Sequence, residues 1–129
     1  MADEITVVTG LAVSNGTRKA EMPVVRQVLD QTGTDHVKGT LSVNFETAET
    51  AIPTGDIGAD DGGLLYVHNL DDTNFVTVHG TGEGTIGAGS DAGGVKILAG
   101  EEQVFRFAKT PYATADTAAV EIEYLLLEA

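Results

Sequence analysis

Residues 63–80, GLLYVHNLDDTNFVTVHG, hold two apolar runs separated by a short acidic segment. Leu64–Asn69 and Phe75–His79 are rich in the aliphatic, aromatic and β-branched residues that favour strands. The residues between them, from Asp71 to Asn74, have short polar side chains that bond back to the backbone of a turn. The sequence therefore predicts a β-hairpin with a tight turn.

The predicted hairpin has two faces of different composition. A turn centred on Asp71-Asp72 would set Val67 opposite Val76 and Leu65 opposite Val78, which makes one apolar face. The other face would carry Leu64, Tyr66, His68, Phe75, Thr77 and His79. This second face is too apolar for simple exposure to water, so we expect another layer or another subunit to cover it. Its predicted interface residues are Tyr66, His68 and Phe75.

The chain on both sides of this segment is also typical of short strands joined by turns. Residues 37–45 alternate between apolar and polar side chains, and residues 95–98 with 103–108 predict a second hairpin. Residues 118–127 predict a closing strand whose core-facing side chains are Val120, Ile122, Tyr124 and Leu126. Eight to ten short strands, with no clear helical segment, indicate an all-β fold, an antiparallel β-sandwich. Connections of variable length suit strands that cross between two sheets, so the predicted topology is a jelly roll.

The first 36 residues differ from the rest and predict an extended N-terminal arm, which leaves residues 37–129 for the sandwich domain. Ile5–Val13 is a β-rich run that ends at the turn signal Ser14-Asn15-Gly16. Residues 23–29 fit either a strand or a short helix. Residues 31–35 have loop composition, and regular alternation begins only after them.

The composition excludes several classes of function. The net charge is −13, from 20 acidic and 7 basic residues, which argues against a nucleic-acid surface and against binding to anionic membranes. The chain has no cysteine, so it can form neither a disulfide nor a thiolate metal site. No apolar run reaches about 18 residues, and the start, MADEITVVTG, lacks the order of a secretory signal. We expect a soluble protein made in the cytoplasm.

Two motifs could bind a cofactor or a metal. Gly82, Gly84 and Gly87 spell G-x-G-x-x-G after a predicted strand, but nearby glycines block the helix that a dinucleotide site needs, so we interpret them as a loop. Carboxylates that could hold Ca²⁺ occur as Asp56, Asp60 and Asp61, and as Asp71 and Asp72. They lack EF-hand spacing, and turn chemistry explains them. We therefore predict no cofactor and no metal.

Candidate catalytic residues are few. His36, His68 and His79 have no metal-binding spacing, and Ser14, Ser42 and Ser90 lack the G-x-S-x-G setting of a nucleophile. Glu121 and Glu123 lie on the outward side of the closing strand and could flank a sugar in a glycosidase, but a solvated sheet face is the ordinary explanation. We expect the protein not to be an enzyme.

Three segments resemble small virion structural proteins of tailed bacteriophages. They are LYVHNLDDTNFV at 65–76, KILAGE at 96–101, and YATADTA at 112–118 leading to EYLLL at 123–127. The resemblance covers residues 37–129 and contains no catalytic residue. It implies a β-sandwich on the capsid surface that decorates or cements the head, commonly as a homotrimer bound to the major capsid protein. The resemblance also allows a second assignment, a structural protein of the tail, the neck or a head fibre.

This resemblance gives the N-terminal arm a role. We expect residues 3–29 to extend onto a neighbour and to add contact area, because many weak contacts multiply when copies attach at several points. The predicted contacts of the arm are Arg18, Lys19, Val25 and Arg26. A carbohydrate-binding module of jelly-roll shape is the alternative. With no Trp and three tyrosines, the chain has few of the aromatic platforms that bind sugars.

Overall fold

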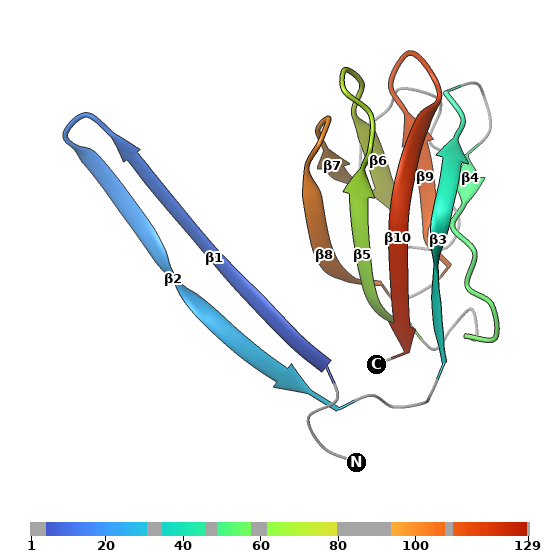
Figure 1. Cartoon of the computed structure of the whole chain (residues 1–129), viewed down its shortest axis with the longest axis horizontal. Helices are drawn as coiled ribbons and strands as arrows, with labels where there is room; N and C mark the ends of the chain where they lie inside the picture. The colour runs from blue at the N-terminus through green and yellow to red at the C-terminus, as the bar shows by residue number, and fades with distance from the viewer. Residues whose placement is uncertain are drawn as a thin grey trace. The chain divides into compact units, whose positions relative to one another are not determined.

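The computed structural model of the chain describes residues 5–30, 35–45, 49–57, 62–79, 94–107 and 110–128 (Figure 1). These residues form ten β-strands and no helix, and so none of them builds a helix that could cross a membrane. The chain divides into two compact units, Met1–Thr32 with Ala129, and Gly33–Glu128. The predicted all-β class is confirmed.

The first unit contains a long antiparallel hairpin of β1 (Ile5–Asn15) and β2 (Arg18–Leu29). Its two-residue turn begins at Gly16, whose φ of 60° is a conformation that glycine adopts without steric penalty. Residues 23–29, which fitted a strand or a helix, are strand. A β-bulge interrupts the pairing between Thr9 and Leu11, where β2 contains Pro23 and lacks a ladder donor.

The second unit is a sandwich of two four-stranded antiparallel sheets, which lie one in front of the other in Figure 1. The first sheet has the order β3 (His36–Val43), β10 (Val120–Glu128), β5 (Gly63–Asn69) and β8 (Glu102–Phe107). The second has the order β4 (Thr50–Ala51), β9 (Tyr112–Ala115), β6 (Val76–His79) and β7 (Val95–Ile97). The predicted antiparallel β-sandwich is confirmed.

Apolar side chains from the inner faces of both sheets, and from the segment that follows β4, form the core. Its large members are Val43, Ile52, Ile57, Leu65, Val67, Val76, Val78, Ile97, Phe107, Val120, Ile122, Tyr124 and Leu126. Each comes from residues 33–128, so the core of the sandwich is built entirely within the second unit. The predicted alternation of the closing strand is confirmed, because its four predicted core residues are at most 6% exposed.

The predicted hairpin of residues 64–79 is wrong, because β5 and β6 belong to different sheets. Val67 pairs with Tyr124 and Gln103, whereas Val76 pairs with strands β9 and β7. Strands β10 and β8 occupy both edges of β5, which leaves β6 no edge to pair with. Residues 70–75 therefore cross between the sheets. The predicted pairing of residues 95–98 with 103–108 is wrong for the same reason, because β7 borders β6 and β8 borders β5.

The residues predicted to share the second face of that hairpin are divided between the two sheets. Leu64, Tyr66 and His68 remain together on β5. Thr77 and His79 are buried on β6, and a Cβ added at Gly94 would lie 2.5 Å from Cε1 of His79. The backbone at residue 94 therefore packs directly on β6, where only glycine fits without displacing its neighbours.

Asn69, which is fully buried, ties together the two crossovers at one end of the sandwich. Its Nδ2 donates to the backbone oxygens of Asn74 at 2.9 Å and Ile97 at 3.1 Å. Its Oδ1 accepts from the N–H of Asp71 at 2.9 Å. Its own backbone bonds to residues 100 and 101 of the second crossover. One side chain thus holds residues 70–75 against the end of β7.

Candidate interaction site

The hairpin exposes large apolar side chains on both of its faces. Six of them are between 41% and 75% exposed, and strand alternation with the observed register places three on each face. They are Leu11, Met22 and Val25 on one face and Val8, Val24 and Val28 on the other. A solvated hairpin would normally keep one face polar, so both faces of this one are suited to contact other protein.

The four predicted contact residues of the arm are all exposed and divide between the two faces. Lys19 and Arg26 lie on the face that also bears Val8, Val24 and Val28, which we call the Arg26 face. Arg18 and Val25 lie on the opposite face, which we call the Leu11 face. Two of the three basic side chains of the hairpin, together with Glu21, therefore lie on the Arg26 face, and the third lies on the Leu11 face.

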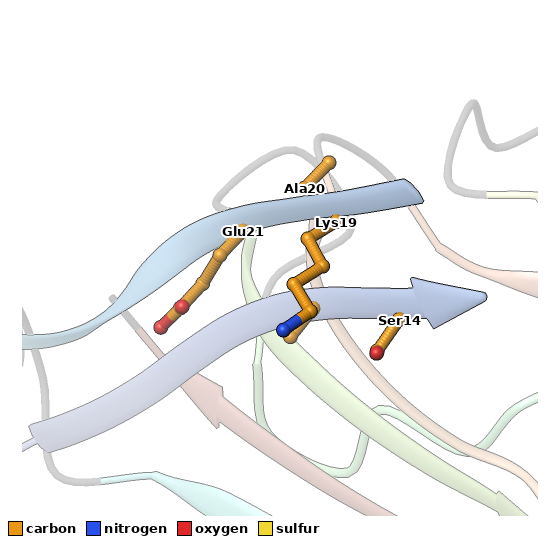
Figure 2. A pocket seen from close by; sticks show the side chains of 5 residues that line it. Ser14, Lys19, Ala20 and Glu21 are labelled. Atoms are coloured by element: carbon orange, nitrogen blue, oxygen red, sulfur yellow. The ribbon is translucent and has the colours of Figure 1, made fainter. Parts of the chain in front are cut away.

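A shallow hollow lies on the hairpin near its turn (Figure 2) and is lined by Ala12, Ser14, Lys19, Ala20 and Glu21. Figure 2 shows the side chains of Lys19 and Glu21 on one side of the ribbon and Ala20 on the other, as strand alternation requires. Ser14 and Lys19 are paired across the strands, and both are exposed. This setting lacks the adjacent, shielded base that would activate the hydroxyl as a nucleophile.

The outer face of the first sheet carries an apolar row beside an acidic row. The register aligns Lys38, Leu125, Tyr66 and Val104 across the four strands. The next row contains Thr40, Glu123, His68 and Glu102. We call this surface the Tyr66 face and define it by Leu64, Tyr66, His68, Glu102, Val104, Glu121, Glu123, Leu125 and Leu127, with Lys38 and Arg106 at its two edge strands.

Tyr66 and His68 meet at one carboxylate on this face. The hydroxyl of Tyr66 donates to Oε1 of Glu102 at 2.9 Å, and Nδ1 of His68 lies 3.8 Å from the same oxygen. Burial of the phenol, its hydrogen bond to Glu102 and the charges of Glu102 and Glu123 raise the pKa of Tyr66 to about 12. At neutral pH the phenol therefore keeps its proton and serves as a hydrogen-bond donor.

Phe75, the third predicted interface residue of the central segment, lies apart from Tyr66 and His68. It is half-buried in the crossover between the sheets, and Nζ of Lys96 lies 4.1 Å from the centre of its ring. Its backbone oxygen accepts from the N–H of Asp116 at 3.2 Å. The structure thus brings together two of the three predicted residues and gives the third a local packing environment.

The other predicted candidates are dispersed. The histidines lie on three strands, and Glu121 and Glu123 project from the outer face of β10. Hydrogen bonds from the backbone of Asn74 and Thr73 lower the pKa of Asp71, as expected of a turn carboxylate. Within the ranges that the structure describes, no three His, Asp or Glu side chains are grouped to hold a metal. Outside the described residues lie Asp60, Asp61, Gly82, Gly84, Gly87 and Ser90.

Replacing Glu102 with Gln is expected to lower the pKa of Tyr66 from about 12 toward its ordinary value of 10.0. The change removes one of the negative charges that oppose ionisation of the phenol. Folding raises this pKa, so Tyr66 contributes stability below pH 10, and this contribution is lost as the pH rises from about 10 to about 12. Ultraviolet titration of the phenolate measures the shift.

The Tyr66→Phe variant identifies the transition in that titration. It should remove the transition near pH 12 that belongs to Tyr66. If the titration curves of wild type and Glu102→Gln superimpose, Glu102 does not control the phenol.

The hairpin and the Tyr66 face have a similar surface composition. Each combines exposed or half-buried apolar side chains with charge, a composition found where proteins contact one another. The hairpin bears three basic side chains and one acidic one, and the Tyr66 face bears Glu102, Glu121 and Glu123 between the edge residues Lys38 and Arg106. No known protein family, curated protein or solved structure is detectably similar to this chain.

Proposed function

We propose that this chain is a structural protein of a tailed-bacteriophage virion that decorates or cements the head. It would act without catalysis, as a homotrimer on the capsid surface bound to the major capsid protein. The observation that carries the proposal is the hairpin of residues 5–29, which presents large apolar side chains on both faces. Such a hairpin serves assembly better than it serves an isolated molecule.

The energetics of the hairpin support this role. A two-stranded hairpin is at best marginally stable alone in water, and exposed apolar patches of this kind usually mark contact sites. Full burial of one Val, Leu or Met side chain contributes about 1.5–3 kcal/mol, so covering even half of the six would provide substantial affinity. Repetition of the contact over many copies on a shell multiplies it further.

The sandwich supports the proposal through its topology. From β3 to β10, successive strands change sheet at every connection except the one between β6 and β7. Eight strands in two sheets with such crossings are the organisation expected of a jelly roll, a fold used by viral capsid proteins. We therefore extend the proposal to a jelly roll with residues 5–29 as its N-terminal arm.

The segments that carry the phage resemblance also fit a structural role. NLDDTN at 69–74 and LAGE at 98–101 form the two crossovers that Asn69 links. Their polar side chains bond to turn backbone, as Asp71 does to Thr73 at 3.0 Å. A signature made of such residues favours a shared scaffold over a shared reaction.

Adding the purified protein to phage heads that lack it tests the proposal. Saturable binding is expected in a sedimentation assay, with new density at local threefold positions in a cryo-electron microscopy map. Leu11→Asp/Met22→Asp is the matched control, because it keeps the chain length and removes two exposed apolar side chains. Density confined to the tail or neck would assign the protein to that part of the virion instead of the head. Failure to bind any part of the particle would refute the proposal.

A further inference from the structure

We infer that the Arg26 face of one copy's hairpin docks on the Tyr66 face of a second copy. The inference rests on the proposed function, because it specifies how copies of a structural protein associate with one another. It assigns the face that bears Arg26 to a sister subunit and leaves the Leu11 face for the surface of the particle. The occupant of the Tyr66 face is therefore the hairpin of another copy of this protein.

Charge is the first argument for a second copy. Residues 5–29 contain three basic side chains, Arg18, Lys19 and Arg26, and one acidic side chain, Glu21. Residues 33–128 contain four basic and sixteen acidic side chains. The hairpin is thus the positive part of a strongly negative molecule, and association of the hairpin with another copy's sandwich joins opposite charges.

The pattern of side chains on the two faces is the second argument. Arg26 pairs with Val8 across the hairpin and has Val24 and Val28 on either side along its own strand, so a single cation is surrounded by exposed apolar groups. The Tyr66 face has the complementary arrangement, an apolar row next to a row that contains Glu102 and Glu123. Face-to-face packing would bury apolar groups together and bring the guanidinium to carboxylates.

Lys19 and Glu21 add a polar margin to the Arg26 face, since Figure 2 shows both on one side of the ribbon. On the Tyr66 face, the hydrogen bond from Tyr66 holds Glu102 in place at 2.9 Å. A carboxylate that is already oriented loses less conformational entropy when it binds a cation. The face is therefore preorganised to receive an arginine.

The size of the surfaces is the third argument. Ten residues of a two-stranded ribbon, at about 3.4 Å per residue and about 10 Å of width, present roughly 340 Å² per face. One docked hairpin would bury roughly twice this area, and a reciprocal exchange of two hairpins would bury roughly 1,400 Å². That total lies within the range of about 1,200–2,000 Å² for specific protein interfaces.

Symmetry also favours exchange between copies. Each copy carries one hairpin and one Tyr66 face, so an assembly in which every arm docks on a neighbour, either a reciprocal dimer or a closed ring, leaves neither surface unused.

Charge reversal tests the pairing in the free, full-length protein. Light scattering and sedimentation equilibrium should show a dimer or trimer for wild type. Arg26→Glu and Glu123→Lys should each weaken self-association by about tenfold or more, and the double variant should recover most of the loss. Arg18→Glu is the matched control, since it makes the same charge change on the opposite face and should leave self-association nearly unchanged.

Several outcomes would overturn the inference. A monomeric wild type would do so, and so would an Arg26→Glu variant that associates as well as wild type. Circular dichroism spectra and melting temperatures of the variants should match those of wild type, because the changed side chains lie outside the core. Variants that fold and still fail to show the pattern of loss and recovery also contradict the pairing.

Cross-linking distinguishes exchange between copies from docking within one chain. The protein has no cysteine, so any disulfide that forms must join the introduced cysteines. Val24→Cys is placed in a tagged copy and Leu125→Cys in an untagged copy. Their mixture should form a disulfide-linked pair of mixed tags under mild oxidation. If the bond forms only when both cysteines are in the same chain, the arm docks on its own sandwich and the inference is wrong.

These measurements need no phage particle, and they therefore separate the inference from the proposed function. A protein that exchanges arms yet does not bind heads would refute only the proposed function. A protein that binds heads as an oligomer, but without cross-links between Val24→Cys and Leu125→Cys, would refute only the inference.

Discussion

Deletion of residues 1–29 is expected to abolish attachment to the phage head while the sandwich remains folded. The deletion removes the hairpin, and with it six large apolar side chains that are 41–75% exposed and three basic side chains. If these groups supply the contact with neighbours, no remaining surface replaces both their area and their charge. Binding in the sedimentation assay should fall below detection.

The sandwich should survive because its internal interactions do not include the hairpin. Strands β1 and β2 form a sheet of their own, and both four-stranded sheets are paired without them. Every residue of the core cluster lies between positions 37 and 126. The truncated chain should therefore keep its β-sheet circular dichroism spectrum and a cooperative unfolding transition near that of the full-length protein.

The Leu11→Asp/Met22→Asp variant is the control for this deletion, because it retains the hairpin sequence around two changed positions. It should lower head occupancy by about tenfold or more, since burial of two charged side chains opposes docking. Full occupancy of heads by the truncated protein would show that the arm is not the attachment element. An unfolded truncated chain would show that the hairpin is needed for folding.

The sequence predicted the features of the fold that depend on local periodicity. The β-class, the alternation along β10 and the turn at Gly16 follow from residues within a few positions of one another. Such patterns report which face of a strand is buried and carry no information about its neighbours.

Strand pairing could not be predicted, because it depends on distant residues. A segment such as Leu70–Phe75 can close a hairpin or cross roughly 10 Å between sheets, and turn-forming side chains suit both paths. Here the edges of β5 are taken by β10 and β8. One residue in the sequence pointed to a crossover between the sheets. Asn69 is polar but occupies a core position in line with Leu65 and Val67, and a hairpin does not explain why it is buried.

The sequence predicted which residues belong to the candidate site but not how they are arranged in space. The exposure of Arg18, Lys19, Val25 and Arg26 agrees with a contact surface, but the bulge shifts the alternation of β2, so simple counting does not assign their faces. Glu102 was missed as the partner of Tyr66 because the two residues are 36 positions apart. Only the pairing of β5 with β8 brings them together.

Replacement of Asn69 by Asp is expected to destabilise the sandwich by about 3 kcal/mol, although the two side chains have the same shape. The amide nitrogen that donates to the oxygens of Asn74 and Ile97 becomes an oxygen, so two acceptors lose their donor and face a buried negative charge. The contact of Oδ1 with the N–H of Asp71 is retained, which confines the damage to the donor side. Urea unfolding monitored by circular dichroism measures the loss.

The pH dependence of the Asn69→Asp variant provides a second readout. Burial raises the pKa of the introduced carboxyl above its unfolded value, so the protonated form is favoured in the folded state and can donate one hydrogen bond. The variant should therefore recover part of its stability as the pH falls toward the unfolded pKa and lose it again as the pH rises.

Asp72→Asn is the control for Asn69→Asp, because it changes an exposed carboxylate in the same crossover that bonds only to its neighbour Thr73 among the described residues. Its effect should be within about 0.5 kcal/mol. Equal stability of the Asn69→Asp variant and wild type would mean that the crossovers are held by their backbone bonds alone. A large loss would show that the side chain of Asn69 is needed to join the two sheets, and variants that remove its hydrogen bonds should then reduce the amount of folded protein while each folded molecule still attaches.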